Sequence, residues 1–265
     1  MMVAAAFNLD WSLIAHRLFS PDSDFGRALW ATIYISVFAE VIGVLLGLVA
    51  ALAGRSHHLV PRTIAGLYTW IVRGTPVIVQ IFFIYFGANI FLGFDLFPRT
   101  VGLFGVEVSG AVVAGIVALA INEGAYMSEI IRAGLSSVDP GQRESALSVG
   151  MTPRMAMRRV ILPQAARIII PPLGNQFNSM MKSTSLLAFI GVYEMFQDAQ
   201  VHYSTDFKPV EYFAAVALWY LALTTVWQLV QAAIERRLAV SERDVVRRRW
   251  RDRLFGVRPE MRGIG

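Results

Sequence analysis

The run ALWATIYISVFAEVIGVLLGLVAALAG occupies residues 28–54 and holds a single charged side chain, Glu40. A helix that crosses a bilayer needs about 20 mostly apolar residues, because the hydrocarbon is roughly 30 Å thick and offers the backbone no hydrogen-bond partner. The run exceeds that length. It therefore predicts a transmembrane helix, and it makes the chain a membrane protein.

The composition of the whole chain agrees with a membrane protein and excludes several kinds of site. Of the 265 residues, 55% are apolar and 16% are charged, and the mean hydropathy is +0.53. The chain has no cysteine, which excludes disulfides, thiolate metal sites and cysteine nucleophiles. Its four histidines are scattered, and no histidine or carboxylate cluster has catalytic spacing. We therefore expect neither a metal site nor a membrane-embedded enzyme.

Four further stretches complete the set of predicted spans. Residues 76–94 and 212–234 carry no charge, whereas two other apolar stretches are interrupted by polar side chains and prolines. We place the start of the second span near Thr63, since only Arg73 separates residues 63–72 from the apolar run that follows. The predicted fold class is all-α and polytopic. The five predicted transmembrane helices lie at about residues 28–54, 63–92, 109–131, 160–193 and 212–235.

The distribution of lysine and arginine predicts how these spans are oriented. With the N-terminus outside, 18 of the 24 basic residues fall in cytoplasmic segments or just inside the adjoining span, and four fall outside. Cytoplasmic segments of membrane proteins carry an excess of lysine and arginine. A separate helix at residues 63–72 would give six crossings and place the two chain ends on one side, which this distribution argues against. We therefore expect a cytoplasmic C-terminus.

The two ends of the chain flank a predicted transmembrane domain, residues 28–238. Residues 1–27 lack a basic segment followed by a signal-peptide core, and their apolar residues at helical spacing predict an interfacial helix on the membrane surface. Residues 239–265 form a basic cytoplasmic tail, whose RRRWRDR run at 247–253 suits lipid headgroups. We favour the lipid bilayer over nucleic acid as the tail's partner, because no nucleic-acid-binding motif accompanies it.

The polar segment 136–159, between the third and fourth spans, has the signals of two short helices. Asp139 can cap the first helix, a proline suits its first turn, and Gln142 stands three residues after the cap as in a capping box. Gly150 then ends the helix, as a left-handed C-terminal residue does. A Thr-Pro pair repeats the start signal for the second helix.

The first of these helices is too short to be stable alone in water, so it must pack against something. It can lie on its own bundle or in a groove on a partner. The residues themselves support these two alternatives about equally. A helix-turn-helix that reads DNA is a third possibility. A membrane span at each end makes entry into a major groove awkward for such a helix.

The same segment resembles the EAA motif of ABC importer permeases, which reads Glu-Ala-Ala, three residues, Gly, nine residues, Ile-x-Leu-Pro. The matching residues, with the same spacing, are Glu144, Ser145, Ala146, Gly150, Val160, Leu162 and Pro163. Ser145 and Val160 depart from the motif by small changes. Flanking stretches resemble the polar amino acid subgroup, the permeases for histidine, glutamine, glutamate, arginine and opines. These stretches are 73–76, 80–87, 129–134, 137–142, 162–165 and 182–186, where Ser183 replaces the usual aspartate.

The resemblance, which covers about residues 28–235, implies a function for the chain. It implies the transmembrane permease subunit of an ATP-driven importer for polar amino acids, similar to type I ABC importers, in the bacterial cytoplasmic (inner) membrane. The implied partners are ABC ATPase subunits, a second permease subunit of the same or a related chain, and an extracytoplasmic amino-acid-binding protein. ATP and magnesium would be bound by the partner ATPase. This chain would need no cofactor and would not be an enzyme, and neither of its two lysines follows a glycine-rich phosphate loop.

The resemblance also implies which residues couple the permease to its ATPase. The capped segment would be a cytoplasmic coupling helix, and alternating access would follow from its movement with the ATPase. Its expected coupling residues are Gly141, Gln142, Glu144, Ser145, Ala146, Gly150, Leu162 and Pro163.

Polar side chains within spans are candidates for the substrate pathway, because ionisable groups are costly in the membrane and often functional. An amino acid offers an ammonium group, which Glu123 could take, and a carboxylate, which Arg73 or nearby hydroxyls could take. The candidates are Arg73, Gln80, Asn122, Glu123, Lys182, Thr184 and Ser185. The alternative for each is a purely structural role at the interface or between helices. Glu40 is equally open to a partner within the bundle.

Two alternatives stay open at this stage. Gly43 and Gly47 form a GxxxG face, which favours packing within the chain over a dimer contact. A secondary transporter or channel for small polar solutes is the other functional class that fits a polytopic chain. Such proteins usually carry internal repeats of their spans, and we find none in this sequence.

Overall fold

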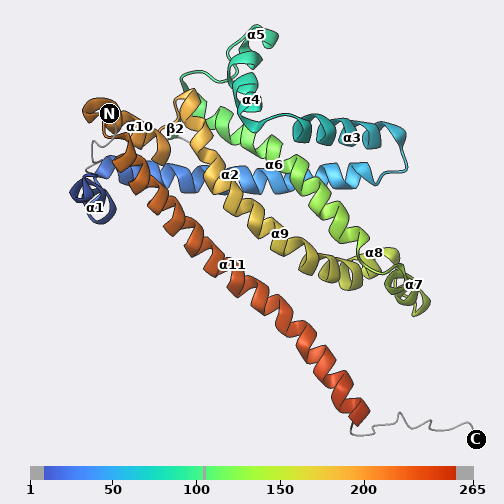
Figure 1. Ribbon diagram of the computed structural model, residues 1–265. Helices are drawn as coiled ribbons and strands as arrows, with labels where there is room; N and C mark the ends of the chain where they lie inside the picture. Colours follow the sequence, from blue (N-terminus) through green and yellow to red (C-terminus); the bar gives the residue numbers. More distant parts are fainter. Residues whose placement is uncertain (1–8, 104–105, 255–265) are drawn as a thin grey trace, which may run out of the picture.

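The computed structural model describes residues 9–103 and 106–254, and most of this chain is helical (Figure 1). The helices are α1 Trp11–Phe19, α2 Ser23–Gly54, α3 Leu59–Gly74, α4 Val77–Phe82, α5 Ala88–Leu92, α6 Gly110–Ser136, α7 Pro140–Ser148, α8 Pro153–Ala156, α9 Leu162–Ser183, α10 Met195–Asp206 and α11 Pro209–Leu254. Two short strands, β1 Thr100–Leu103 and β2 Val106–Ser109, add an antiparallel hairpin in which Thr100 pairs with Ser109.

Helices α2 and α6 form the most extensive contact of the bundle, and α9 packs against both (Figure 1). A Cβ built on Gly43 would lie only 2.7 Å from the Cβ of Glu123, and one built on Gly47 would overlap the Cβ of Met127. Small residues allow two backbones to approach this closely in a membrane, where no hydrophobic force draws helices together. The predicted packing of the GxxxG face within the chain is confirmed.

This contact predicts that Gly47→Ala destabilises the protein. The added methyl group collides with Met127, and overpacking of this kind typically costs about 1–3 kcal/mol. We expect the variant, purified in detergent, to unfold at a lower midpoint temperature than the unaltered protein. Size-exclusion chromatography of heated samples measures this midpoint. Gly66→Ala on α3 is the matched control, because no atom lies within 4 Å of a Cβ built there. Equal midpoints for the two variants would contradict the packing argument.

Within the described residues, three helices are long and apolar enough to cross a membrane: α2, α6 and the first part of α11, Pro209–Leu238. The pair Leu59–Gly74 and Val77–Gly87 makes a fourth candidate if it counts as one broken span. The expected span at 160–193 corresponds to α9 followed by a 3₁₀ segment, Thr184–Ile190. The number of five crossings therefore stays a prediction.

The second expected span, at 63–92, differs from the single helix foreseen. Its two halves meet at an angle of 110°, with Thr75 in an extended conformation before Pro76. Proline lacks the N–H that would continue the helix, so the carbonyls before it lose their partners. The Gln80 side-chain amide supplies a donor in place of the missing N–H. It donates to the Val72 carbonyl at 2.7 Å and to the Thr75 carbonyl at 3.0 Å. Beyond the bend, α4 packs against α6 through the fully buried Ile81, and α5 lies further from the bundle (Figure 1).

The N-terminal segment is attached to the start of α11 at one end of the molecule (Figure 1). The predicted interfacial segment covers residues 1–27, of which residues 1–8 lie outside the described part. Ile14 of α1 is buried, and Lys208 donates to Asp10 at 2.8 Å. The Lys208 ammonium group holds the pKa of the Asp10 carboxyl below its usual range. Part of the apolar side of α1 therefore packs on protein, and whether the segment also lies on the membrane surface stays a prediction.

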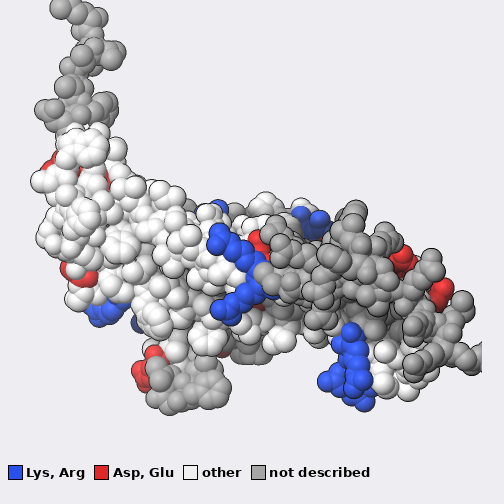
Figure 2. Space-filling view, turned by 90° about the horizontal axis from the view of Figure 1, so that it is seen from below, with Lys and Arg blue, Asp and Glu red and all other residues white. Residues whose placement is uncertain are grey.

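Helix α11 continues past the boundary that the sequence suggested at residue 238. It runs for 46 residues to Leu254 as one continuous helix, so the basic tail begins inside a helix. The rest of the predicted tail, residues 255–265, lies outside the described part. Figure 2 shows a broad uncharged surface between the charged side chains at the left of the view and the basic side chains near its centre. Such a surface suits contact with lipid.

Candidate functional site

Helices α7 and α8 lie at the end of the bundle opposite to α1 and α10 (Figure 1). The Asp139 carboxylate caps α7 by accepting from the Gly141 N–H at 2.7 Å, and Thr152 caps α8. Gly150, between them, has φ +84°. The Met151 N–H donates to the Ala146 carbonyl at 3.1 Å, which completes a left-handed helix stop. The predicted helix, glycine turn and helix are confirmed.

The side chains of α7 divide into an inner contact and an outer surface. Ala146 is buried, and the Gln142 side chain accepts a hydrogen bond from Gln164 at the start of α9. Leu147 and Val149 are exposed, Val149 to 74%. Of the expected coupling residues, four on α7 and two at the start of α9 are wholly or partly exposed: Gly141, Gln142, Glu144, Ser145, Leu162 and Pro163. This end of the molecule thus offers polar and apolar groups together.

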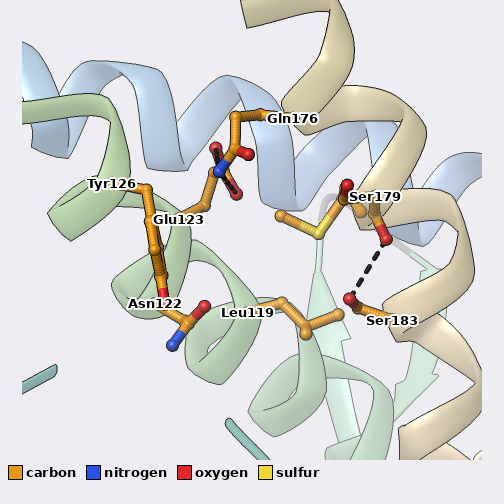
Figure 3. Close-up of a pocket in the computed structure, with 8 residues that line it drawn as sticks. Leu119, Asn122, Glu123, Tyr126, Gln176, Ser179 and Ser183 are labelled. Carbon is orange, nitrogen blue, oxygen red and sulfur yellow. Dashed lines mark hydrogen bonds between the residues drawn. The ribbon is translucent and has the colours of Figure 1, made fainter. Parts of the chain in front are cut away.

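A polar cavity of about 190 Å³ lies between α6 and α9 (Figure 3). From α6 it is lined by Leu119, Asn122, Glu123 and Tyr126, which share one helical face; from α9 it is lined by Gln176, Ser179, Met180 and Ser183. Cavities for drug-sized ligands measure about 300–1,000 Å³, so this one suits a smaller ligand. The lining includes one acidic side chain and neither lysine nor arginine.

Glu123 is the acidic side chain of this cavity. It is only 5% exposed, and the Gln176 amide donates to its two oxygens at 3.3 and 3.5 Å (Figure 3). A buried carboxylate needs such partners, because leaving water without compensation is costly. The Ser183 hydroxyl donates to the Ser179 carbonyl, which is also drawn in Figure 3. The cavity therefore offers a carboxylate and several groups that accept or donate hydrogen bonds.

Two of the predicted pathway residues line the cavity, and two lie next to it. Asn122 and Glu123 are lining residues, and Asn122 donates to Gln80 at 3.0 Å. The Arg73 guanidinium lies 5.5 Å from the centre of the Tyr126 ring and 3.8 Å from the Glu129 carboxylate. Arg73 thus contacts Tyr126, which lines the cavity, and its charge is offset by an ion pair.

The other three predicted pathway residues, Lys182, Thr184 and Ser185, do not line this cavity. The hydroxyl of Thr184 donates to the Met181 carbonyl and that of Ser185 to the Lys182 carbonyl. Lys182 is exposed. The hydroxyls that were expected to hold a substrate carboxylate are instead bonded to their own backbone.

Sequence reasoning missed three polar residues of α9: Gln176, Ser179 and Ser183. Their spacing of three and then four residues puts them on one helical face, and this pattern could have identified them. Ser183 drew attention only as a departure from a motif.

Comparison with known proteins places this geometry in a family. Residues 43–240 match the family described as the binding-protein-dependent transport system inner membrane component. The chain belongs to this family. It is accordingly a multi-pass permease of the inner membrane, and in ABC importers such permease subunits are not themselves catalytic.

Individual relatives agree with this assignment. The permease is 38% identical over 213 residues to the probable amino-acid permease protein YxeN of Bacillus subtilis, covering 80% of this chain and 90% of that one. It is 35% identical over 210 residues to the glutamine transport system permease protein GlnP of Escherichia coli, covering 79% and 90%.

A solved structure, an amino acid ABC transporter crystallised with histidines, has the same fold. It superposes on this permease with a TM-score of 0.73 at 35% identity, covering 89% of this chain and all of that one. The predicted resemblance to amino acid ABC permeases is confirmed.

Proposed function

We propose that this permease imports a polar amino acid across the bacterial cytoplasmic membrane and that the cavity between α6 and α9 binds the amino acid during passage. The observation that carries the proposal is the burial of Glu123 in a polar cavity within a transport family. The Glu123 carboxylate faces the ammonium group of the substrate. Asn122, Ser179 and Ser183 line the rest of the cavity. The two hydroxyls donate to backbone carbonyls of α9, so their oxygens are left to accept hydrogen bonds from the ligand.

The energy for transport comes from ATPase subunits that dock on α7. Its cap and its left-handed stop at Gly150 hold a short helix rigidly, and its exposed apolar groups support a docking surface. ATP and magnesium belong to those subunits, and hydrolysis takes place there. Glu144, on exposed α7, supplies a charge to the contact.

The same proposal includes the orientation and the remaining partners. The bias of lysine and arginine supports a cytoplasmic α7 and C-terminus and an outside N-terminus. The opposite end, with α1 and α10, then faces the extracytoplasmic amino-acid-binding protein (Figure 1). A second permease subunit, identical or related, completes the pathway.

Reconstitution in liposomes tests the function. The permease, co-purified with its partners and supplied with its binding protein, is expected to show ATP hydrolysis stimulated by polar amino acids and uptake that stops with a non-hydrolysable ATP analogue. Uptake without ATP, driven by an ion gradient, would instead assign the chain to the secondary transporters. Testing the amino acids one at a time identifies the substrate.

A further inference from the structure

A cavity of about 210 Å³ lies between α2, α3 and α6, apart from the one between α6 and α9. It lies where α2 ends and α3 begins, since its lining includes Gly54, the last residue of α2, and Arg62, the fourth residue of α3. The space exists because α2 and α3 meet here through small side chains, and a Cβ added to Gly66 would have no atom within 4 Å. These small residues are Ala50, Ala51, Gly54, Ala65 and Gly66.

Positive charge gathers around this cavity. Arg62 of α3 and Arg132 of α6 both line it. Arg132 pairs with Glu129, and Arg73, further along α3, pairs with the same carboxylate at 3.8 Å. Arg62 forms no ion pair or side-chain hydrogen bond with any residue that the structure describes. Three guanidinium groups are thus offset by one carboxylate, and the cavity attracts an anion.

The position of the cavity in the bundle favours an anion that belongs to a lipid. The uncharged run 41–54 of α2 ends at Arg55, so a cavity lined by Gly54 lies close to the depth of the lipid headgroups. On α3, Leu59 is exposed three residues before Arg62, and Trp70 is exposed to 73%. Such apolar side chains suit lipid rather than water. The cavity is smaller than the 300–1,000 Å³ typical of drug-sized ligands, so it holds a headgroup while the acyl chains lie outside.

We propose that this cavity binds the phosphate of an anionic phospholipid from the adjoining leaflet. The guanidinium groups of Arg62 and Arg132 hold the phosphate oxygens, because the planar donors of arginine match that geometry. The acyl chains extend from the cavity along α3 towards Trp70. Basic pockets between transmembrane helices bind anionic headgroups in this way. The lipid joins α3 to α6, and the site is separate from the cavity proposed for the transported amino acid.

Tryptophan fluorescence of the permease with its co-purified partners, in vesicles, tests the inference. Trp70 stands eight residues after Arg62, about 12 Å further along the helix, where an acyl chain would pass. Bromine atoms on an acyl chain quench tryptophan on contact, and subtracting the quenching seen with Trp70→Phe leaves the part due to Trp70. The vesicles contain equal amounts of phosphatidylglycerol and phosphatidylcholine, and either one or the other lipid carries the bromine. We expect the relative affinity beside Trp70 to favour phosphatidylglycerol by about fivefold.

Variants of one arginine show whether the cavity causes this preference. We expect Arg62→Gln to remove most of it and Arg62→Lys, which keeps the charge, to retain part of it. Arg99→Gln, which changes an exposed arginine before β1, is expected to leave the preference unaltered. Equal quenching by the two lipids in the unaltered protein would overturn the inference, even if Arg62→Gln failed to fold. Full preference for phosphatidylglycerol in a folded Arg62→Gln variant would overturn it as well.

Inorganic phosphate separates a lipid from a soluble anion. In vesicles of phosphatidylcholine alone, we expect added inorganic phosphate to leave the midpoint of thermal unfolding unchanged. A rise in this midpoint that Arg62→Gln removes, together with equal quenching by the two lipids, would assign the cavity to soluble phosphate and overturn the lipid site.

Discussion

Replacing Gly150 with arginine is expected to abolish ATP-driven uptake while the protein still inserts into the membrane. Gly150 has φ +84°, a conformation that costs a residue with a side chain about 1–2 kcal/mol. The arginine also adds a long cationic side chain beside the exposed surface of α7. Both effects disturb a turn that the proposed docking needs, and neither touches the membrane spans. Uptake and ATPase stimulation in liposomes measure the loss.

Gly150→Asn is the matched control, because asparagine adopts the left-handed conformation more readily than other residues with side chains. It is expected to retain much more uptake than Gly150→Arg. No atom lies within 4 Å of a Cβ at this position, so the smaller side chain meets no obstacle. If Gly150→Arg still supported full ATP-driven uptake, α7 would not be the coupling element.

Replacing Glu123 with alanine is expected to raise the apparent KM for amino acid uptake by about tenfold or more, since hydrogen bonds to charged groups contribute about 1.5–3 kcal/mol. Alanine keeps the Cβ that packs against Gly43, so the contact between α2 and α6 survives. Only the carboxylate and its bonds to Gln176 are lost. Substrate-stimulated ATPase activity gives a second readout.

Glu129→Ala, six residues further along α6, is the control for this change. Its carboxylate pairs with Arg73 and Arg132 and does not line the cavity. We expect it to change the apparent KM much less than Glu123→Ala. An unaltered apparent KM in the Glu123 variant would remove Glu123 from the binding site.

The local signals in the sequence predicted the structure of the polar segment 136–159 well. Asp139 and Thr152 cap helices, and Gly150 ends one, because these roles depend on the chemistry of a few neighbouring atoms. The bend after Thr75 was harder to foresee. Proline marks a break, but the 110° angle accompanies hydrogen bonds from Gln80 to carbonyls up to eight residues away.

The cavity could be predicted only in part, because it is formed by two helices that are distant in sequence. Asn122 and Glu123 were foreseen from their polarity within a span. Gln176 became significant only once α9 was seen to face Glu123. Thr184 shows the opposite error, because it was predicted to line the pathway and does not. A hydroxyl can bond to a ligand or to the backbone, and that of Thr184 donates to the Met181 carbonyl in its own helical turn. Polarity identifies candidates, whereas the packing of helices selects among them.

The continuity of α11 makes the C-terminal region a rigid rod. At 1.5 Å per residue its 46 residues span roughly 70 Å, more than twice the thickness of the hydrocarbon. The uncharged run 212–234 ends at Glu235, so the remaining turns project beyond it without a break in the helix. Any tilt of this helix in the bilayer is therefore carried, and enlarged, to its far end. When the helix tilts, the basic segment at its end is therefore displaced further than the part inside the membrane.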